Sequence, residues 1–256
     1  AIVGDIHGYM KLMYSKISTI ENQLNIKIRF IIQLGDFFSK HFTYLFYDYL
    51  SLKKPSSDID CYYHFSNPIP KRTYFIGGNH DDLGDYKNND NYSEIELVSS
   101  LVYLGRAGVK SIDGFDFGFV SGNYSPVSFN AKEGKYHHIT EKDTKQLTSD
   151  SKHTDVLFFH DWPSIRRFSD NIDTSSIMPE ISNLKRAISK KVGNDPLFDL
   201  VIAKKPKYVF AGHVHIYLQL LAHFESFDVR FISLDRIWHD NSICIFDTNN
   251  FDFKIF

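Results

Sequence analysis

Cysteine is scarce in this sequence: only Cys61 and Cys244 occur among 256 residues. Two cysteines are too few for the disulfide framework of a small secreted protein, so we expect a reducing compartment and take the cytoplasm as the location. An apolar run of about 18 residues, which a membrane-spanning helix needs, is also absent, and we expect no membrane partner. The net charge of -2 excludes nucleic-acid binding through bulk charge and leaves room for a local basic patch.

A leading methionine and a signal peptide are lacking too, because the chain opens at Ala1 on a short apolar run. We therefore expect that the first strand is longer than the part present here. Apolar residues, in contrast, are abundant: they make up 43% of the chain, with 23 Phe and 15 Tyr. This content excludes a disordered chain, and the length allows a sizeable core. Internal repeats and long linkers are absent, so we expect one domain over residues 1–256.

Apolar runs alternate along the chain with helical patterns, which predicts an α/β fold. We expect strands over residues 1–3, 29–34, 73–76, 155–159 and 208–210, and further strands between residues 217 and 256. A hairpin is expected over residues 110–120, because Asp113-Gly114 suits a two-residue turn. Helices are expected over residues 13–24, 42–52 and 181–192, after the capping pair Thr140 and Asp143, and from Asp195-Pro196 with Asp195 as cap. Residues 53–70 are expected to be loop-rich.

Five of the apolar runs end in polar side chains that can bind a metal ion. In chain order these are Asp5 and His7, Asp36, the Asn79-His80-Asp81 block, His160, and the pair His213 and His215. Because strand ends in an α/β sheet point their loops at one crevice, we expect these side chains to converge. Imidazoles suit Zn, Fe or Mn, and carboxylate or amide oxygens suit harder ions. Each block alone is also compatible with a turn or with a structural or surface histidine, and the prediction therefore depends on the joint pattern.

Taken together, the five blocks resemble the calcineurin-like metallophosphoesterase superfamily over nearly the whole chain. The resemblance implies a four-layer αββα sandwich of two mixed β-sheets, with a dinuclear metal site at the strand ends. It implies that Asp5, His7 and His215 hold one divalent ion, that Asn79, His160 and His213 hold the other, and that Asp36 bridges both. His80 would face the phosphate, and Asp81 would orient His80.

The resemblance also implies a mechanism for hydrolysing a phosphoester. Two ions, taken as Mn, Fe or Zn, would share a water molecule and lower its pKa, so that a metal-bridging hydroxide attacks the phosphorus. Protonated His80 would stabilise the phosphate or donate a proton to the leaving oxygen.

A closer resemblance is to the RNA lariat debranching enzymes and their uncharacterised relatives. The matching stretches include Tyr74-Phe-Ile-Gly-Gly-Asn-His80, Tyr103-Leu-Gly-Arg-Ala-Gly-Val109 and, most specific, His160-Asp-Trp-Pro163. It implies a phosphodiesterase whose substrate is a nucleic acid, RNA being the candidate, or a nucleotide, with a nuclear location if the enzyme is eukaryotic. The chain departs from those enzymes in having Asp5 in place of the usual Cys and a compact segment between residues 121 and 159. We also expect that it lacks their C-terminal domain.

Several questions stay open at the level of sequence. Tyr124, Trp162 and Arg166 are candidate substrate contacts, with His137, His138 and Arg167 beside them, because aromatic rings stack on bases and arginines bind phosphate. The alternative is that Trp162 packs in the core and that the arginines are solvated. A phosphomonoesterase or protein phosphatase of the same superfamily is the second candidate function. The protein phosphatase is disfavoured, because the resemblance implies an Arg shortly after Asp36 in such enzymes and none follows it closely here. A non-catalytic scaffold is the third, and the oligomeric state has no signal.

Overall fold

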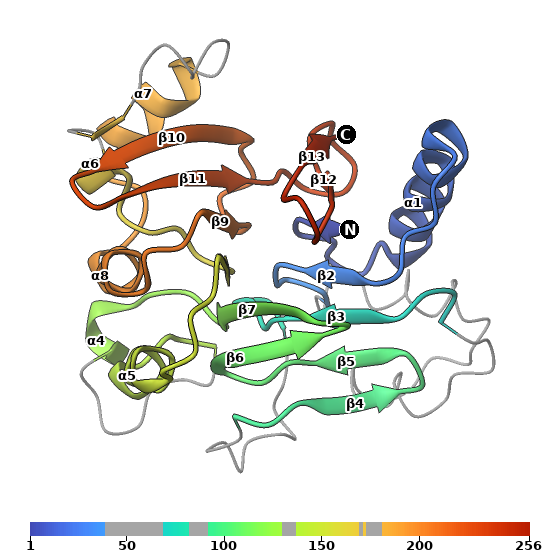
Figure 1. The fold of residues 1–256 in the computed structure, drawn as a ribbon, viewed down its shortest axis with the longest axis horizontal. Coiled ribbons are helices and arrows are strands. Elements are labelled where there is room, and N and C mark those ends of the chain that lie inside the picture. Colours follow the sequence, from blue (N-terminus) through green and yellow to red (C-terminus); the bar gives the residue numbers. More distant parts are fainter. Residues whose placement is uncertain (39–68, 82–91, 130–136, 169–170, 173–180) are drawn as a thin grey trace.

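The computed structural model describes residues 1–38, 69–81, 92–129, 137–168, 171–172 and 181–256. In these segments two mixed β-sheets form the centre of the molecule and helices lie outside them (Figure 1). The expected helix over residues 42–52 and most of the expected loop over residues 53–70 lie outside the described residues. None of the described helices combines the length and apolar character needed to cross a membrane.

The first sheet has seven strands in the order β13-β12-β1-β2-β3-β5-β4. Their bounds are Phe253–Ile255, Ile243–Phe246, Ile2–Val3, Ile31–Gln33, Thr73–Phe75, Leu101–Tyr103 and Ile95–Val98, in the same order. Strands β1, β2, β3 and β5 run parallel to their neighbours in this set, whereas β4, β12 and β13 pair in the antiparallel sense. The strands expected over residues 1–3, 29–34 and 73–76 are thus confirmed. Strands β12 and β13 lie in the C-terminal segment where further strands were expected, and β4 and β5 are additions.

The second sheet has six strands in the order β10-β11-β9-β8-β7-β6. Their bounds are Leu218–Phe224, Phe227–Ser233, Tyr208–Ala211, Val156–Phe159, Phe115–Val120 and Ala107–Ile112. Strands β6 and β7 form the hairpin expected around Asp113-Gly114, where both residues have positive φ. The hairpin begins at Ala107, three residues before the apolar pattern predicted.

Six described helices accompany the sheets: α1 (Met10–Leu24), α4 (Pro126–Phe129), α5 (Glu141–Ser149), α6 (Ile165–Phe168), α7 (Ile181–Ser189) and α8 (Asp195–Lys204). The capping pair at α5 is confirmed, because Thr140 and Asp143 form a reciprocal capping box. The expected cap of α8 is wrong by one residue. Asn194 is the cap, since its backbone is extended and its Oδ1 accepts from the Leu197 N–H at 3.0 Å.

Successive side chains of the central strands point to opposite faces of each sheet, and together they build three apolar layers. Ile31 packs with α1 on the outer face of the first sheet, while its neighbour Ile32 packs between the two sheets. In the second sheet Phe158 faces the space between the sheets, and Leu157 packs with the outer helices. Strands buried on both faces require continuous apolar runs, which is the pattern seen in the sequence. The result is the expected four-layer αββα sandwich.

Candidate metal centre

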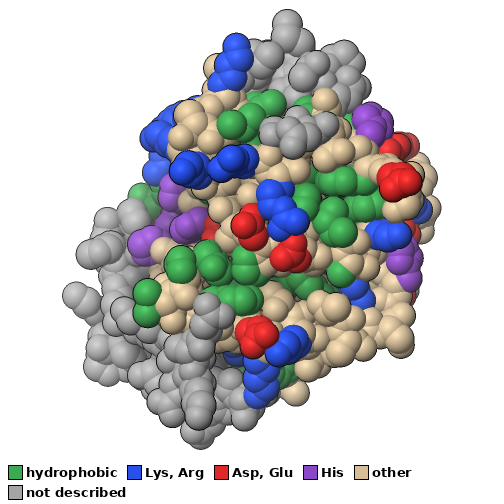
Figure 2. Space-filling model, turned by 90° about the vertical axis from the view of Figure 1, so that its left-hand side faces the viewer, with side chains coloured by type: hydrophobic (Ala, Val, Ile, Leu, Met, Phe, Trp, Pro, Cys, Tyr) green, Lys and Arg blue, Asp and Glu red, His purple; other side chains and the backbone are tan. Residues whose placement is uncertain are grey.

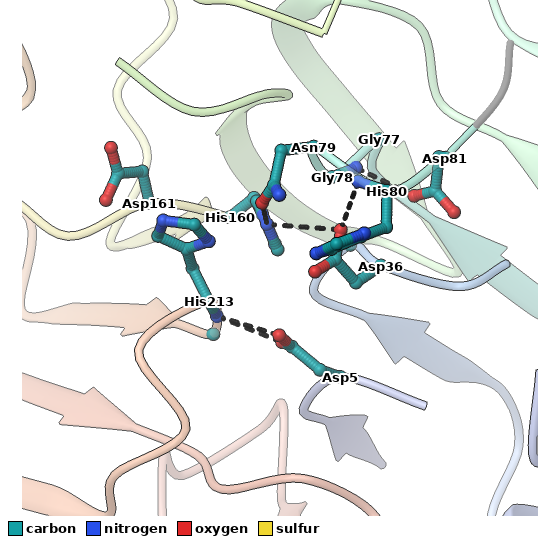
Figure 3. A network of polar contacts seen from close by, with 12 residues as sticks. Asp5, Asp36, Gly77, Gly78, Asn79, His80, Asp81, His160, Asp161 and His213 are labelled. Atoms are coloured by element: carbon teal, nitrogen blue, oxygen red, sulfur yellow. Dashed lines mark hydrogen bonds and ion pairs between the residues drawn. The ribbon is translucent and has the colours of Figure 1, made fainter. Parts of the chain in front are cut away.

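The five candidate ligand blocks follow the carboxyl ends of β1, β2, β3, β8 and β9. The first three strands are parallel neighbours in one sheet, and the last two are parallel neighbours in the other. The loops after them therefore meet at one end of the sandwich, where Figure 3 shows Asp5, Asp36, Asn79, His160 and His213 close together. The convergence predicted from the strand pattern is what this fold produces.

One group of candidate ligands consists of Asp5, His7, Asp36 and His215, whose donor atoms all lie within 4.8 Å of one another. The Nε2 atoms of His7 and His215 are 3.2 Å apart, and His215 Nε2 lies 2.9 Å from Asp5 Oδ2. Three of the four side chains are buried, and His215 is half-buried. Carboxylate and imidazole donors at this spacing fit a divalent transition-metal ion.

The second group consists of Asp36, His160 and His213, again within 4.8 Å. Asn79 adds an amide oxygen, because its Oδ1 lies 3.0 Å from His160 Nε2. Asp36 Oδ1 is 3.5 Å from the same nitrogen. Two imidazoles, a carboxylate and an amide oxygen form a donor set that fits a second divalent ion.

Asp36 is common to both groups. Its Oδ2 lies 3.9 Å from His7 Nε2, while its Oδ1 faces His160. Burial, together with the negative charges of Asp5 and Asp81, raises the pKa of Asp36 well above its ordinary value. A carboxylate in this position needs cations to remain ionised. Its place between the two groups fits a ligand that bridges two metal ions.

The histidine tautomer is fixed by a hydrogen bond at His160. The Nδ1–H of His160 donates to the Leu34 carbonyl oxygen at 2.8 Å, which leaves the Nε2 lone pair directed at the second ligand group. Burial lowers the pKa of His160 to about 3 and that of His7 to about 4. Both imidazoles are therefore neutral near pH 7, which is the form that binds a metal.

Unusual backbone conformations bring the ligands inward. His7, Asp36, His213 and His215 all have φ between 44° and 65°. Residues other than glycine rarely adopt these values, and such strain concentrates at functional sites. Gly78 packs so closely on Asp36 that a Cβ at position 78 would overlap its backbone and carboxylate. The metal centre thus depends on tight turns as well as on ligand types.

His80 and Asp81 have different surroundings. His80 is exposed, its ring centroid lies 5.3 Å from that of His7, and its backbone N–H donates to Asp36 Oδ1 at 2.8 Å. Asp81 is buried, and its carboxylate accepts from the N–H groups of Phe38 and Gly78 at 2.6 and 2.7 Å. Burial raises the pKa of Asp81 to about 7. These contacts give Asp81 the task of joining the loops after β2 and β3.

Sequence reasoning overlooked Gln33. This fully buried side chain donates from Nε2 to the carbonyl oxygens of Gly4 and Gly35, and its Oε1 accepts from the Gly35 N–H. It therefore joins the loop that carries Asp5 to the loop that carries Asp36. A lone polar residue inside the apolar run of β2 is the signal that could have identified it.

The three predicted substrate contacts have different outcomes. Trp162 is fully buried and its indole N–H donates to the Gly212 carbonyl at 2.7 Å, so the alternative that it packs in the core is confirmed and its stacking on a base is excluded. Tyr124 and Arg166 line one pocket of about 510 Å³ together with Arg167, Lys191 and the start of α8. In Figure 2, the face of the molecule on the α6 and α8 side carries a gathering of Lys and Arg side chains.

Asp161 joins this pocket to the metal centre. The carboxylate accepts from the Tyr124 N–H at 2.9 Å and from the Asn194 side-chain amide at 3.2 Å. In Figure 3 it points away from Asp36, on the far side of His213. The residue next to a candidate ligand thus determines where Tyr124 and the α8 cap lie.

Comparison with known proteins agrees with this geometry. The family described as Calcineurin-like phosphoesterase matches residues 1–217. The chain is 28% identical over 232 residues to a lariat debranching enzyme of Drosophila pseudoobscura pseudoobscura, covering 84% of this chain and 42% of that protein. It is 27% identical over 268 residues to the lariat debranching enzyme of Entamoeba histolytica, covering 96% and 71%. The chain therefore spans less than half the length of some of the relatives it matches.

A solved crystal structure with 13% sequence identity has the same fold. Its TM-score is 0.60, and the match covers 99% of this chain and 96% of that one. This likeness agrees with the two-sheet architecture described above. The chain belongs to the calcineurin-like phosphoesterase family, a family of hydrolases that act on phosphoester bonds.

Proposed function

We propose that this chain is a metal-dependent phosphodiesterase that hydrolyses a nucleic-acid or nucleotide diester, with branched RNA as the first candidate substrate. The observation that carries the proposal is Asp36, which is shared by two groups of candidate metal ligands beside the exposed His80. The relatives named as lariat debranching enzymes supply the candidate substrate.

Each site residue has a task in this proposal. Asp5, His7 and His215 would hold one divalent ion, Asn79, His160 and His213 the other, and Asp36 both. When bound, the pair would supply an activated water and neutralise the charge that develops on the phosphate oxygens. His80, exposed at the mouth of the site, would bind a phosphate oxygen or give a proton to the leaving oxygen.

Asp81 would act on His80 through the backbone. Its carboxylate accepts from the N–H of Gly78, just before the Asn79-His80 pair, and from the N–H of Phe38, in the loop after β2. The amide of His80 is in turn bound to Asp36. The position of His80 relative to Asp36 would therefore be set by hydrogen bonds of the backbone: those that Asp81 accepts and the one that the His80 amide donates to Asp36.

The pocket beside α8 is an argument for a substrate that extends beyond a single phosphate group. Arg166, Arg167 and Lys191 line it, and it continues from Tyr124, whose backbone Asp161 holds. Arg166 and Lys191 line this pocket, and we assign their side chains to a second phosphate. Guanidinium and ammonium groups bind phosphate without reading sequence, as expected for an enzyme that selects a linkage.

The test compares two RNAs that differ only in linkage. Metal-reconstituted protein is incubated with a 2′,5′-branched RNA and with the matched linear RNA, and cleavage is followed on a gel. We expect the unmodified protein to cleave the branched RNA and to leave the linear RNA intact, and we expect the His80→Ala protein to leave the branch intact. If the branch stays intact while small diesters are cleaved, the phosphodiesterase activity is supported and branched RNA is rejected as its substrate. Turnover confined to monoesters would reject the proposal as a whole.

A further inference from the structure

The loop between β11 and β12 is attached to the metal centre. The N–H of Ile237 donates to the backbone carbonyl of Asp5 at 2.9 Å, and the Ile237 side chain is fully buried. Within the loop, the Arg236 N–H donates to the Asp235 carboxylate at 2.7 Å, and the His239 N–H donates to the Arg236 carbonyl at 2.9 Å. The loop thus has a fixed conformation beside a candidate ligand.

On this loop Trp238 presents an aromatic ring next to the ligands. It is one of only two tryptophans in the chain and is 37% exposed, whereas Trp162 is fully buried. Its ring centroid lies 5.9 Å from that of His7 and 5.0 Å from that of Tyr9. A large apolar ring that remains exposed at the edge of a polar site is typical of a binding surface.

Arg236, on the other side of Ile237, offers a donor that the described residues leave unused. Its Nε is buried and has no hydrogen-bond partner, and none of the described carboxylates forms an ion pair with its guanidinium. Its Cζ lies 5.0 Å from the Trp238 ring centroid. That cation–π contact places the guanidinium but supplies no acceptor for its Nε–H. A buried Nε–H without an acceptor, on a side chain that is half-buried overall, indicates an anion supplied by a ligand.

We propose that Arg236 and Trp238 form a nucleotide-binding subsite beside the metal centre. Arg236 binds an oxygen of the substrate phosphate, and Trp238 stacks on a base adjacent to it. This inference rests on the proposed function and narrows its substrate class to diesters that carry a nucleobase next to the scissile bond. The paired contacts suit nucleotides because a guanidinium recognises phosphate and an indole recognises the face of any base.

A matched pair of probes tests the stacking. The dinucleotide ApA and a dinucleotide analogue with abasic sugars carry the same phosphodiester, and only the first can stack. We expect ApA to quench the tryptophan fluorescence of the metal-loaded His80→Ala protein, which turns over slowly. The abasic probe should leave the emission unchanged. Trp238→Phe keeps an aromatic ring and removes the emitter, so the quenching should disappear while Trp162 still emits.

Kinetics with the same two probes separates the two contacts. Trp238→Ala should raise KM for ApA by roughly 5- to 150-fold, the effect of losing one stacked base, with kcat nearly unchanged. Trp238→Phe should retain most of the affinity, and neither variant should alter KM for the abasic probe. Arg236→Met should raise KM for both probes, because both carry phosphate, and Arg236→Lys should restore part of the loss.

The outcomes distinguish the subsite from the proposed function. Hydrolysis of ApA with no quenching, and with an unchanged KM in Trp238→Ala, would overturn the subsite and leave the phosphodiesterase intact. Quenching by ApA that depends on Trp238, without hydrolysis of any diester, would support the subsite and overturn the proposed function. Equal quenching by both probes would also overturn the stacking, since the abasic probe has no base.

Discussion

The backbone N–H of His80 donates a hydrogen bond to Oδ1 of Asp36 at 2.8 Å. The proposed proton donor therefore positions, through its main chain, the carboxylate that we propose as the bridge between two ions, while its own side chain is exposed. Because a substitution at position 80 keeps this amide, the two functions of the residue can be separated.

We expect His80→Ala to keep both metal ions and to lose turnover by roughly 10²- to 10⁴-fold, the usual contribution of general acid catalysis. The amide that holds Asp36 remains in this variant, so the ligand geometry is retained. Metal content by mass spectrometry and steady-state turnover on a diester are the two measurements. Turnover retained by a metal-replete variant would exclude His80 as the acid, and loss of metal would show that the imidazole holds the site together.

Asp36→Asn should weaken both metal ions together. An amide can contribute one neutral oxygen, and it cannot bridge two cations as a carboxylate does. The measurement is metal content after dialysis, with Asp161→Asn as the control, because Asp161 is a carboxylate of the same site that belongs to neither ligand group. Loss of a single ion from Asp36→Asn would contradict the bridging role.

Asp5→Cys should move the metal preference toward zinc. Thiolates are soft ligands, whereas the native carboxylate suits harder ions such as Mn²⁺. We expect a higher ratio of bound Zn to Mn than in the unmodified chain after reconstitution in an equimolar mixture of the two. Comparison with that chain corrects for Cys61 and Cys244, and burial raises the pKa of the Cys244 thiol, which disfavours its use as a ligand. An unchanged ratio would mean that position 5 does not select the ion.

Arg106→Met should destabilise the fold by about 3–5 kcal/mol, the typical result of removing one partner of a buried ion pair. Arg106 forms two hydrogen bonds to Asp143, at 2.6 and 2.9 Å, and a third to the His138 carbonyl at 2.7 Å. Asp143 is fully buried and also caps α5.

The measurement for Arg106→Met is the free energy of unfolding from urea titration. Lys152→Met is the matched control, because Lys152 pairs with Asp116 at 2.7 Å on the surface, where such pairs contribute at most about 1 kcal/mol. Equal effects of the two substitutions would show that the buried pair adds nothing beyond a surface contact.

The local pattern of apolar residues was sufficient to predict the strands that carry the candidate metal ligands. Strands buried on both faces appear as unbroken apolar runs, and a parallel strand delivers the residue after it to the sheet edge. The convergence of Asp5, Asp36 and His160 could therefore be predicted from the order of apolar runs and polar residues alone. Short-range chemistry likewise predicted the Asp113-Gly114 turn and the capping box at α5.

The burial and the hydrogen-bond partners of individual side chains, in contrast, were decided by residues distant in the sequence. The His160-Asp-Trp-Pro163 motif gives no indication that Trp162 reaches the Gly212 carbonyl or that Asp161 supports Tyr124. The α8 cap moved by one residue because cap choice depends on the backbone angles of Asn194.

The sequence by itself indicated the candidate ligands, because polar side chains end five of its apolar runs. The resemblance of those five blocks to a known family then implied the sandwich and the division of the ligands between two ions. Only the tertiary structure decided which tryptophan is buried and which one lies beside the metal centre, since the exposure of a side chain depends on what the rest of the chain packs against it. It alone brought Arg236 and Trp238 next to His7, which lies near the opposite end of the sequence, through the hydrogen bond from Ile237 to Asp5.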